Sequence, residues 1–302
     1  MRHVSTPRSL DLAAGVSHAR IATARGAHAA LVAGDPGDPM MLLVPGFTGS
    51  KEDFLAVIAP LAAGGLRVVA LDQRGQCDTP GTGREDDASL EALAADLAAL
   101  GEALGSRPAH LVGKSLGGLV ARAAVLAAPR RWASLTLLGS GPAAVPQAQR
   151  EGLLALRQAL PGTPLPVVWE VAQARDRANG VPLPPAPVQA FLRRRFLAND
   201  ACSLRAKAAI LLEEPDRVAA LAAVLAAEAM PAAVVTGADD DVWSPAEQEQ
   251  MAARLDRPWI EVPGAGHSPA VDAPAATVAA LMGVLEHGLR TRGLPEPGRA
   301  EG

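Results

Sequence analysis

The stretch "HLVGKSLGGLVAR", residues 110–122, joins an apolar run to a helix-like run through a serine flanked by glycines. Two motifs overlap in it. Gly113-Lys114-Ser115 matches the end of a phosphate-binding loop, G-x-x-x-x-G-K-[ST], in which the serine would ligate magnesium. Gly113 to Gly117 equally match G-x-S-x-G, a sharp strand-to-helix turn in which the serine would be a nucleophile.

The phosphate-loop interpretation fails because the first half of the motif is missing. That motif needs a glycine five positions before Gly113, where this chain has Pro108. The segment that follows Pro108, "AHLV", is an apolar strand rather than a loop of free N–H groups, and proline removes one donor. The strand-to-helix turn instead needs small residues around a strained serine, and Gly113 and Gly117 supply them. The sequence therefore predicts Ser115 as a nucleophile.

A serine hydroxyl is a poor nucleophile at neutral pH, so it needs a base, and the base needs an orienting carboxylate. In this type of site the acid and then the histidine follow the serine along the chain. An acidic run in "VVTGADDDVWSP" follows a predicted strand, and we expect Asp240 to be the acid, with Asp241 as the alternative. We expect His267, in "GAGHSP", to be the base.

Acyl transfer also requires N–H donors for the oxyanion that forms in the transition state. The backbone N–H of Leu116, directly after the serine, is one expected donor. Phe47, in the loop "PGFTGS" after a buried strand, is the other. Trp169 and Trp243 are candidates for the wall of a substrate pocket, although core packing is the favoured role for each.

Short β-type runs alternate with alanine- and leucine-rich helical runs, which predicts an α/β fold around a mostly parallel sheet. The alternation stops between residues 141 and 230, where helical and proline-rich segments indicate an inserted cap over the carboxyl edge of the sheet. We expect an N-terminal extension at 1–16, a core at 17–142 and 230–290, a helical cap at 143–229 and a disordered C-terminal tail at 291–302.

The composition indicates a globular protein with a sizeable core, since 49% of the 302 residues are apolar and 20% are charged. A formal net charge of −4 gives no reason to expect nucleic acid or an anionic membrane as a partner. The N-terminal segment lacks a secretory apolar region, and no apolar run reaches the ~20 residues of a membrane span. With two cysteines in the chain, we expect a cytoplasmic location and leave the oligomeric state open.

The stretches "VPGFTGSKEDF", "VVALDQRGQCDTPG", "LVGKSLGGLVAR", "TGADDDVWSP" and "GAGHSP" together resemble the α/β-hydrolase superfamily. The resemblance implies the α/β-hydrolase fold, a mostly parallel central sheet flanked by helices with an inserted helical cap. It also implies Ser115 as nucleophile, His267 as base and Asp240 as its orienter, with no cofactor and no metal. Lys114 stands at a variable position that is often histidine in relatives, and we expect its side chain to pack or to reach solvent.

On this basis we expect a serine hydrolase that cleaves a carboxylic ester or lactone of a small to medium apolar substrate through an acyl-enzyme. A serine in the turn and the lack of tyrosine in the chain disfavour epoxide hydrolases and haloalkane dehalogenases. The alternatives are a peptidase of the proline-iminopeptidase type, a carbon–carbon hydrolase, a tailoring enzyme of secondary metabolism, and a ligand-binding protein with an inactive site.

Overall fold

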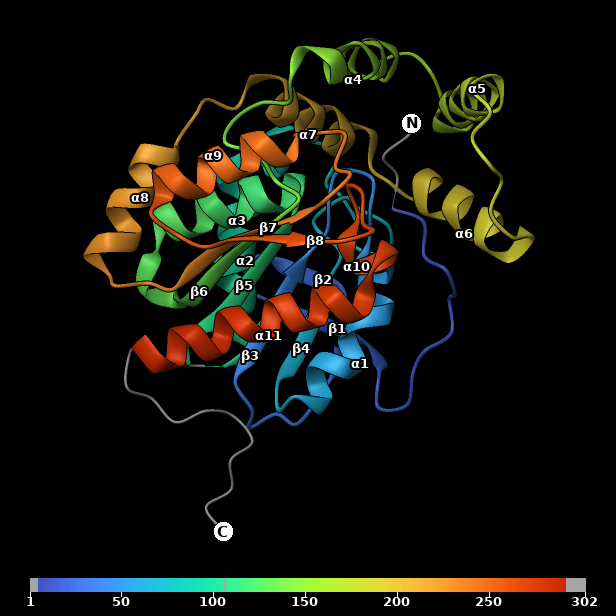
Figure 1. Ribbon diagram of the computed structural model, residues 1–302. Helices are drawn as coiled ribbons and strands as arrows, with labels where there is room; N and C mark the ends of the chain where they lie inside the picture. The colour runs from blue at the N-terminus through green and yellow to red at the C-terminus, as the bar shows by residue number, and fades with distance from the viewer. Residues whose placement is uncertain (1–4, 106, 292–302) are drawn as a thin grey trace.

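The computed structural model describes residues 5–105 and 107–291 and is built around one eight-stranded sheet (Figure 1). The strand order is β1-β2-β4-β3-β5-β6-β7-β8. The strands are β1 (Ser17–Thr23), β2 (Gly26–Ala33), β3 (Met40–Val44), β4 (Arg67–Leu71), β5 (Ala109–Lys114), β6 (Trp132–Leu138), β7 (Ala232–Gly237) and β8 (Trp259–Val262).

The sheet is parallel from β4 to β8, which confirms the predicted sheet type, and antiparallel at the end formed by β1 and β2. The β1–β2 hairpin was not predicted. Strand β1 reads "SHARIAT" and alternates between exposed and half-buried positions, so it lacks the apolar run by which the buried strands are recognised. A two-residue turn, Ala24-Arg25, joins it to β2.

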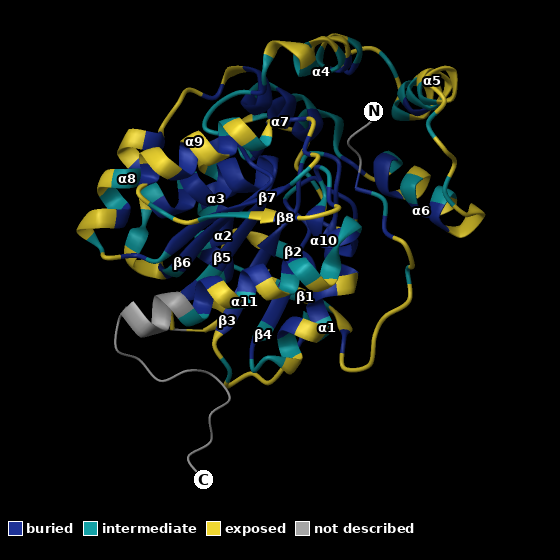
Figure 2. Ribbon diagram, in the orientation of Figure 1, coloured by how far each residue is buried: buried dark blue, intermediate teal, exposed yellow. Residues whose placement is uncertain are grey.

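Helices cover both faces of the sheet, whose central strands β3, β4 and β5 are buried almost throughout (Figure 2). One face packs against α2, α3, α8 and α9, and the other against α1, α10 and α11. These helices are α1 (Leu55–Ala63), α2 (Leu90–Leu104), α3 (Leu116–Ala127), α8 (Val218–Ala227), α9 (Pro245–Leu255), α10 (Pro269–Asp272) and α11 (Pro274–Thr291). Short 3₁₀ turns are η1 (Lys51–Phe54), η2 (Asp86–Ala88) and η3 (Pro129–Arg131).

The segment between β6 and β7 contains α4 (Gln147–Ala159), α5 (Leu165–Ala178), α6 (Ala186–Leu197), α7 (Ala201–Glu213) and then α8. Figure 1 shows α4, α5 and α6 standing away from the sheet, where α4 and α5 contribute to a cavity over Ser115. By contrast, Leu211 of α7 and Leu221 and Leu225 of α8 belong to the main hydrophobic core. The segment predicted as a cap therefore contains a protruding part and a part that continues the core.

A buried arginine fastens the protruding part to the core. The Arg195 guanidinium, on α6, donates to Asp53 Oδ1 of η1 at 2.7 Å and to the carbonyl oxygen of Ser5 at 2.7 Å. Ser5, within the predicted N-terminal extension, also shares a hydroxyl hydrogen bond with Ser268 at 2.7 Å. Residues 292–302 of the predicted tail lie outside the described residues. Among the described helices, none has both the length and the apolar character to cross a membrane.

Lys207 joins α7 to the loop that follows β4. Its Nζ donates to the carbonyl oxygen of Arg74 at 2.8 Å, and the side chain is fully buried. Burial penalises the charged amine and lowers the pKa of Lys207 to about 7, although Asp72 and Asp200 act in the opposite direction.

The lowered pKa of Lys207 predicts a pH-dependent stability. Between this pKa of about 7 and the ordinary value of 10.5, the unfolded chain binds more protons than the folded one, so the free energy of unfolding rises with pH. Relative to Lys207→Met, the wild type should gain about 2 kcal/mol between pH 7 and pH 9. Urea denaturation at both pH values measures the difference, and parallel pH dependences would contradict this account of Lys207.

Candidate active site

Ser115 lies at the tip of the turn between β5 and α3 with φ 55° and ψ −121°. A positive φ is strained for a residue that carries a side chain, so the surrounding structure must hold it. One such restraint is the Ser115 N–H, which donates to the carbonyl oxygen of Leu138 in β6 at 3.0 Å. The turn therefore projects the hydroxyl beyond the carboxyl edge of the sheet.

The glycines around Ser115 are required by close packing. A Cβ on Gly113 would lie 2.6 Å from Gly118 Cα and would overlap the carbonyl of Gly117. A Cβ on Gly117 would lie 2.6 Å from the carbonyl oxygen of Pro45 and would overlap that of Val44. These contacts are with backbone atoms, which cannot rotate away, so each position accepts only a residue without a side chain.

His267 connects Ser115 to an aspartate. His267 lies in the loop between β8 and α10; its Nε2 is 2.9 Å from Ser115 Oγ and its Nδ1 is 3.0 Å from Asp240 Oδ1. All three side chains are buried. The structure thus brings the three residues singled out in the sequence into one continuous hydrogen-bonded chain, drawn from three separate loops.

The Asp240 carboxylate is held on both oxygens. Oδ1 also accepts from the Val242 N–H at 2.9 Å, and Oδ2 accepts from Gln248 Nε2 at 2.9 Å. Burial opposes ionisation, but the hydrogen bond and charge of His267, with the other two hydrogen bonds, outweigh it and lower the pKa of Asp240. Asp241, the alternative acid, is exposed, and its backbone carbonyl accepts from Gln149 of α4.

Gln248, on α9, is a part of this site that sequence reasoning missed. Its Oε1 accepts from Thr236 Oγ1 at 2.8 Å, and its Nε2 also donates to the Trp243 carbonyl at 2.8 Å. Gln248 is completely buried and shares its helix face with Met251 and Leu255. A glutamine at the apolar spacing of a helix is the signal that identifies it, because a buried amide must find partners.

The loop after β3, which contains Phe47, lies next to the turn at Ser115, because a Cβ on Gly46 would be 3.2 Å from Ser115 Cβ. Within the described residues, neither the N–H of Phe47 nor that of Leu116 donates a hydrogen bond to the protein. Gln76 Nε2 donates to the carbonyl oxygens of Gly46 and Phe47 at 2.7 and 3.1 Å, and Gln73 Nε2 donates to that of Pro45 at 2.9 Å. These two glutamines, which sequence reasoning also missed, fix the loop by its carbonyls.

A cavity of about 700 Å³ opens above Ser115 and His267, between the core and the cap. Apolar residues of α4 and α5, such as Leu156 and Val168, line much of it. Trp169 and Trp243 are not among the residues that line it, so they are not part of this pocket wall and their positions agree with the favoured packing role. Both side chains are packed against other rings instead. The ring centroids of Trp169 and Phe196 are 5.6 Å apart, and those of Trp243 and His267 are 6.2 Å apart.

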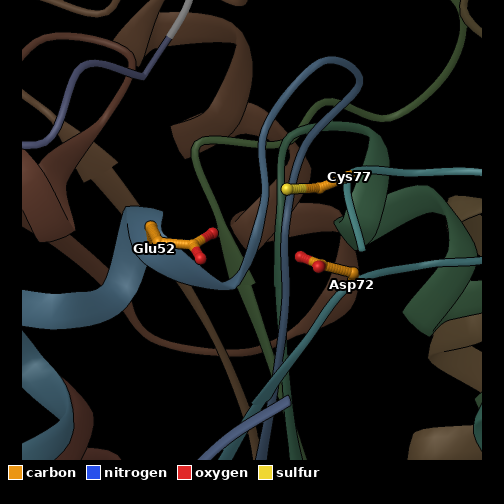
Figure 3. Close-up of side chains that lie close together, drawn as sticks. All are labelled: Glu52, Asp72 and Cys77. Atoms are coloured by element: carbon orange, nitrogen blue, oxygen red, sulfur yellow. The ribbon is translucent and has the colours of Figure 1, made fainter. Parts of the chain in front are cut away.

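A possible cation site lies outside this cavity, where Glu52, Asp72 and Cys77 place their donor atoms within 4.8 Å of one another (Figure 3). The ammonium of Lys51 already serves this cluster, at 2.8 Å from Asp72 Oδ2, 2.9 Å from Glu52 Oε1 and 2.6 Å from Asp78 Oδ2. Burial also raises the pKa of the Cys77 thiol, which keeps it protonated. The cluster thus fits a structural lysine, and the expected lack of a metal stays a prediction.

Residues 39–167 match the sequence model of a family described as alpha/beta hydrolase fold. This range includes Ser115 and the loop of Phe47, and it ends before Asp240 and His267. The fold, the order of the strands and the position of the strained serine agree with this match.

Three similar proteins illustrate the match. The chain is 34% identical over 139 residues to the rhodomycin D methylesterase DauP of Streptomyces sp. (strain C5), covering 44% of this chain and 46% of that protein. It is 37% identical over 100 residues to the sn-1-specific diacylglycerol lipase ABHD11 of Mus musculus, covering 33% and 32%. The structure of a hydrolase from Pseudomonas aeruginosa PA01 superimposes with a TM-score of 0.65 at 26% identity, covering 90% and 99%. The matched segments thus span less than half of either curated relative.

The packing at the turn predicts a sharp contrast between two glycines. Gly117→Ala should lower the free energy of unfolding by about 1–3 kcal/mol, because the new methyl group overlaps two backbone carbonyls. Gly283→Ala, in the interior of α11 with no atom near the new methyl group, should instead raise it by about 0.5–1 kcal/mol. Chemical denaturation of both variants measures this, and similar effects at the two sites would refute the packing argument.

Proposed function

We propose that this chain, which belongs to the α/β-hydrolase superfamily, is a serine hydrolase that cleaves a carboxylic ester or lactone through an acyl-enzyme. The observation that carries the proposal is the hydrogen-bonded chain from Ser115 Oγ through His267 to Asp240. A buried serine at a strained turn, with a base and an orienting carboxylate in line, has the parts that nucleophilic catalysis needs.

In the proposed reaction, Ser115 Oγ attacks the substrate carbonyl carbon while His267 Nε2 takes its proton. Ionised Asp240 holds the imidazole by Nδ1 and stabilises the imidazolium that forms. The N–H groups of Phe47 and Leu116 donate to the oxyanion. Collapse of the intermediate expels the alcohol, which takes the proton from His267. Water, deprotonated by the same nitrogen, then attacks the acyl-enzyme. Collapse of this second intermediate returns the proton from His267 to Ser115 Oγ and releases the acid.

Ester chemistry is supported by the two curated relatives, which are by name a methylesterase and a lipase. The volume of the cavity, about 700 Å³, limits the size of the substrate to a small or medium molecule. Its apolar walls, such as Leu156 of α4, favour a hydrocarbon part in the acyl or alcohol group. The proposed partner is thus a small-molecule ester or lactone.

A fluorophosphonate probe, which reacts with activated serines, tests the nucleophile. The wild type should be labelled stoichiometrically, and Ser115→Ala should not react. Ser140→Ala is the matched control, because Ser140 is also buried near the turn but its hydroxyl has no hydrogen-bond partner among the described residues. Labelling that persists in Ser115→Ala, or that disappears in Ser140→Ala alone, would overturn the assignment.

Substitution of two neighbouring aspartates tests which one orients His267. Asp240→Asn should lower kcat by roughly 10³–10⁴-fold, because an amide no longer holds the imidazole in the tautomer that accepts the serine proton. Asp241→Asn, at an exposed position outside the hydrogen-bonded chain, should change kcat less than about threefold. Steady-state hydrolysis of a short-chain ester measures both, and the reverse pattern would make Asp241 the acid.

A further inference from the structure

Lys114, the last residue of β5, lies in the cavity wall directly before Ser115. Its side chain is only 5% exposed, so it does not reach bulk solvent. It runs beside Gly46: a Cβ placed on Gly46 would be 3.4 Å from Lys114 Nζ and 3.2 Å from Ser115 Cβ. The amine and the serine are therefore neighbours on the same face of Gly46, and all three residues line the cavity.

This amine has no hydrogen-bond acceptor among the residues that the structure describes. Within residues 5–105 and 107–291, no hydrogen bond or ion pair is formed by Lys114 Nζ. The nearest acids are engaged elsewhere: Asp53 with Arg195 at 2.7 Å, Asp240 with His267 at 3.0 Å, and Asp272 with the Gly266 N–H at 3.0 Å. An ammonium has three hydrogen atoms to donate, and leaving them unpaired in a buried place is costly.

The charges around the amine favour an anion. Asp53 is paired with Arg195, while Asp240 and Asp272 act on Lys114 through their charge without a direct contact, so among the described residues no carboxylate is hydrogen-bonded to the amine. Burial lowers the pKa of Lys114, while Asp53 and Asp240 partly oppose that shift. An anion bound in the cavity would add to their effect and hold the amine in its charged form. The other charged residues of the lining, Glu151, Arg175 and Asp241, are exposed.

We propose that Lys114 binds a carboxylate of the substrate, so that the preferred substrate is an ester or lactone with a free carboxylate a few bonds from the scissile carbonyl. The short separation follows because Lys114 Nζ and Ser115 Cβ both lie within 3.4 Å of one point, the position that a Cβ on Gly46 would take. The hydrocarbon part of such a substrate lies against the apolar wall formed by α4 and α5. This inference rests on the proposed function, since it names the substrate class of the same site.

Two esters of matched shape test the proposal: monoethyl glutarate, and ethyl 5-methylhexanoate, in which an isopropyl group replaces the carboxylate. The readout is the ratio of their kcat/KM values, measured by ethanol release, because a ratio cancels any loss of turnover common to both. The wild type should favour the carboxylate substrate, and Lys114→Met should reduce the ratio roughly 10- to 100-fold, as expected for loss of a hydrogen bond between charged groups.

Lys207→Met is the matched control, because it also removes a buried lysine but one that donates to the Arg74 carbonyl and does not line the cavity. It should leave the ratio unchanged. As a second measurement, glutarate itself should inhibit hydrolysis of the neutral ester competitively in the wild type and no longer in Lys114→Met.

The outcomes separate the two proposals. Hydrolysis that depends on Ser115, with the same ratio and the same inhibition by glutarate in wild type and Lys114→Met, would overturn the carboxylate site and leave the serine hydrolase in place. Failure to hydrolyse either ester, together with failure of the fluorophosphonate to label Ser115, would overturn both.

Discussion

The close approach of three backbone segments around Ser115 is the constraint on which the rest of the site depends. Gly113 lets the end of β5 pack against the backbone of Gly117 and Gly118 at the start of α3, where a Cβ would not fit. Gly117 in turn lets α3 pack against the carbonyls of Val44 and Pro45. That packing holds Ser115 at φ 55°. The loop that contains Phe47 also lies beside Ser115, since a Cβ on Gly46 would be 3.2 Å from Ser115 Cβ. Backbone strain of this kind is typical of functional sites.

Much of this arrangement could be predicted from the sequence because its signals are local. Glycine spacing identified the turn, and the alternation of runs identified the mostly parallel sheet. Asp240 and His267 are far from Ser115 in the chain, yet their places after strands β7 and β8 made them recognisable. A parallel sheet brings the carboxyl ends of its strands to one edge, so chain order predicts spatial proximity.

The features that could not be predicted from the sequence depend on contacts between residues far apart in the chain. Nothing local distinguishes Gln73 and Gln76 from other loop glutamines, although they hold the loop of Phe47 by its carbonyls. Residue type alone left two roles open for Trp169 and Trp243, the pocket wall and the favoured core packing, and the fold uses both for packing. Lys114 was expected to pack or to reach solvent; it is buried, but in the cavity wall beside the serine. That its amine lacks hydrogen-bond partners among the described residues can be recognised only once the positions of the neighbouring acids are known.

The central claim, that Ser115 forms a covalent bond with the acyl group, is tested most directly by trapping that intermediate. The protein is mixed with an excess of ester, quenched in acid within the first turnovers, digested with trypsin and analysed by mass spectrometry. The account predicts one added acyl group per chain, carried by the peptide that starts at Ser115, after cleavage at Lys114. An acyl group found on a different residue, or turnover that continues in Ser115→Ala, would contradict it.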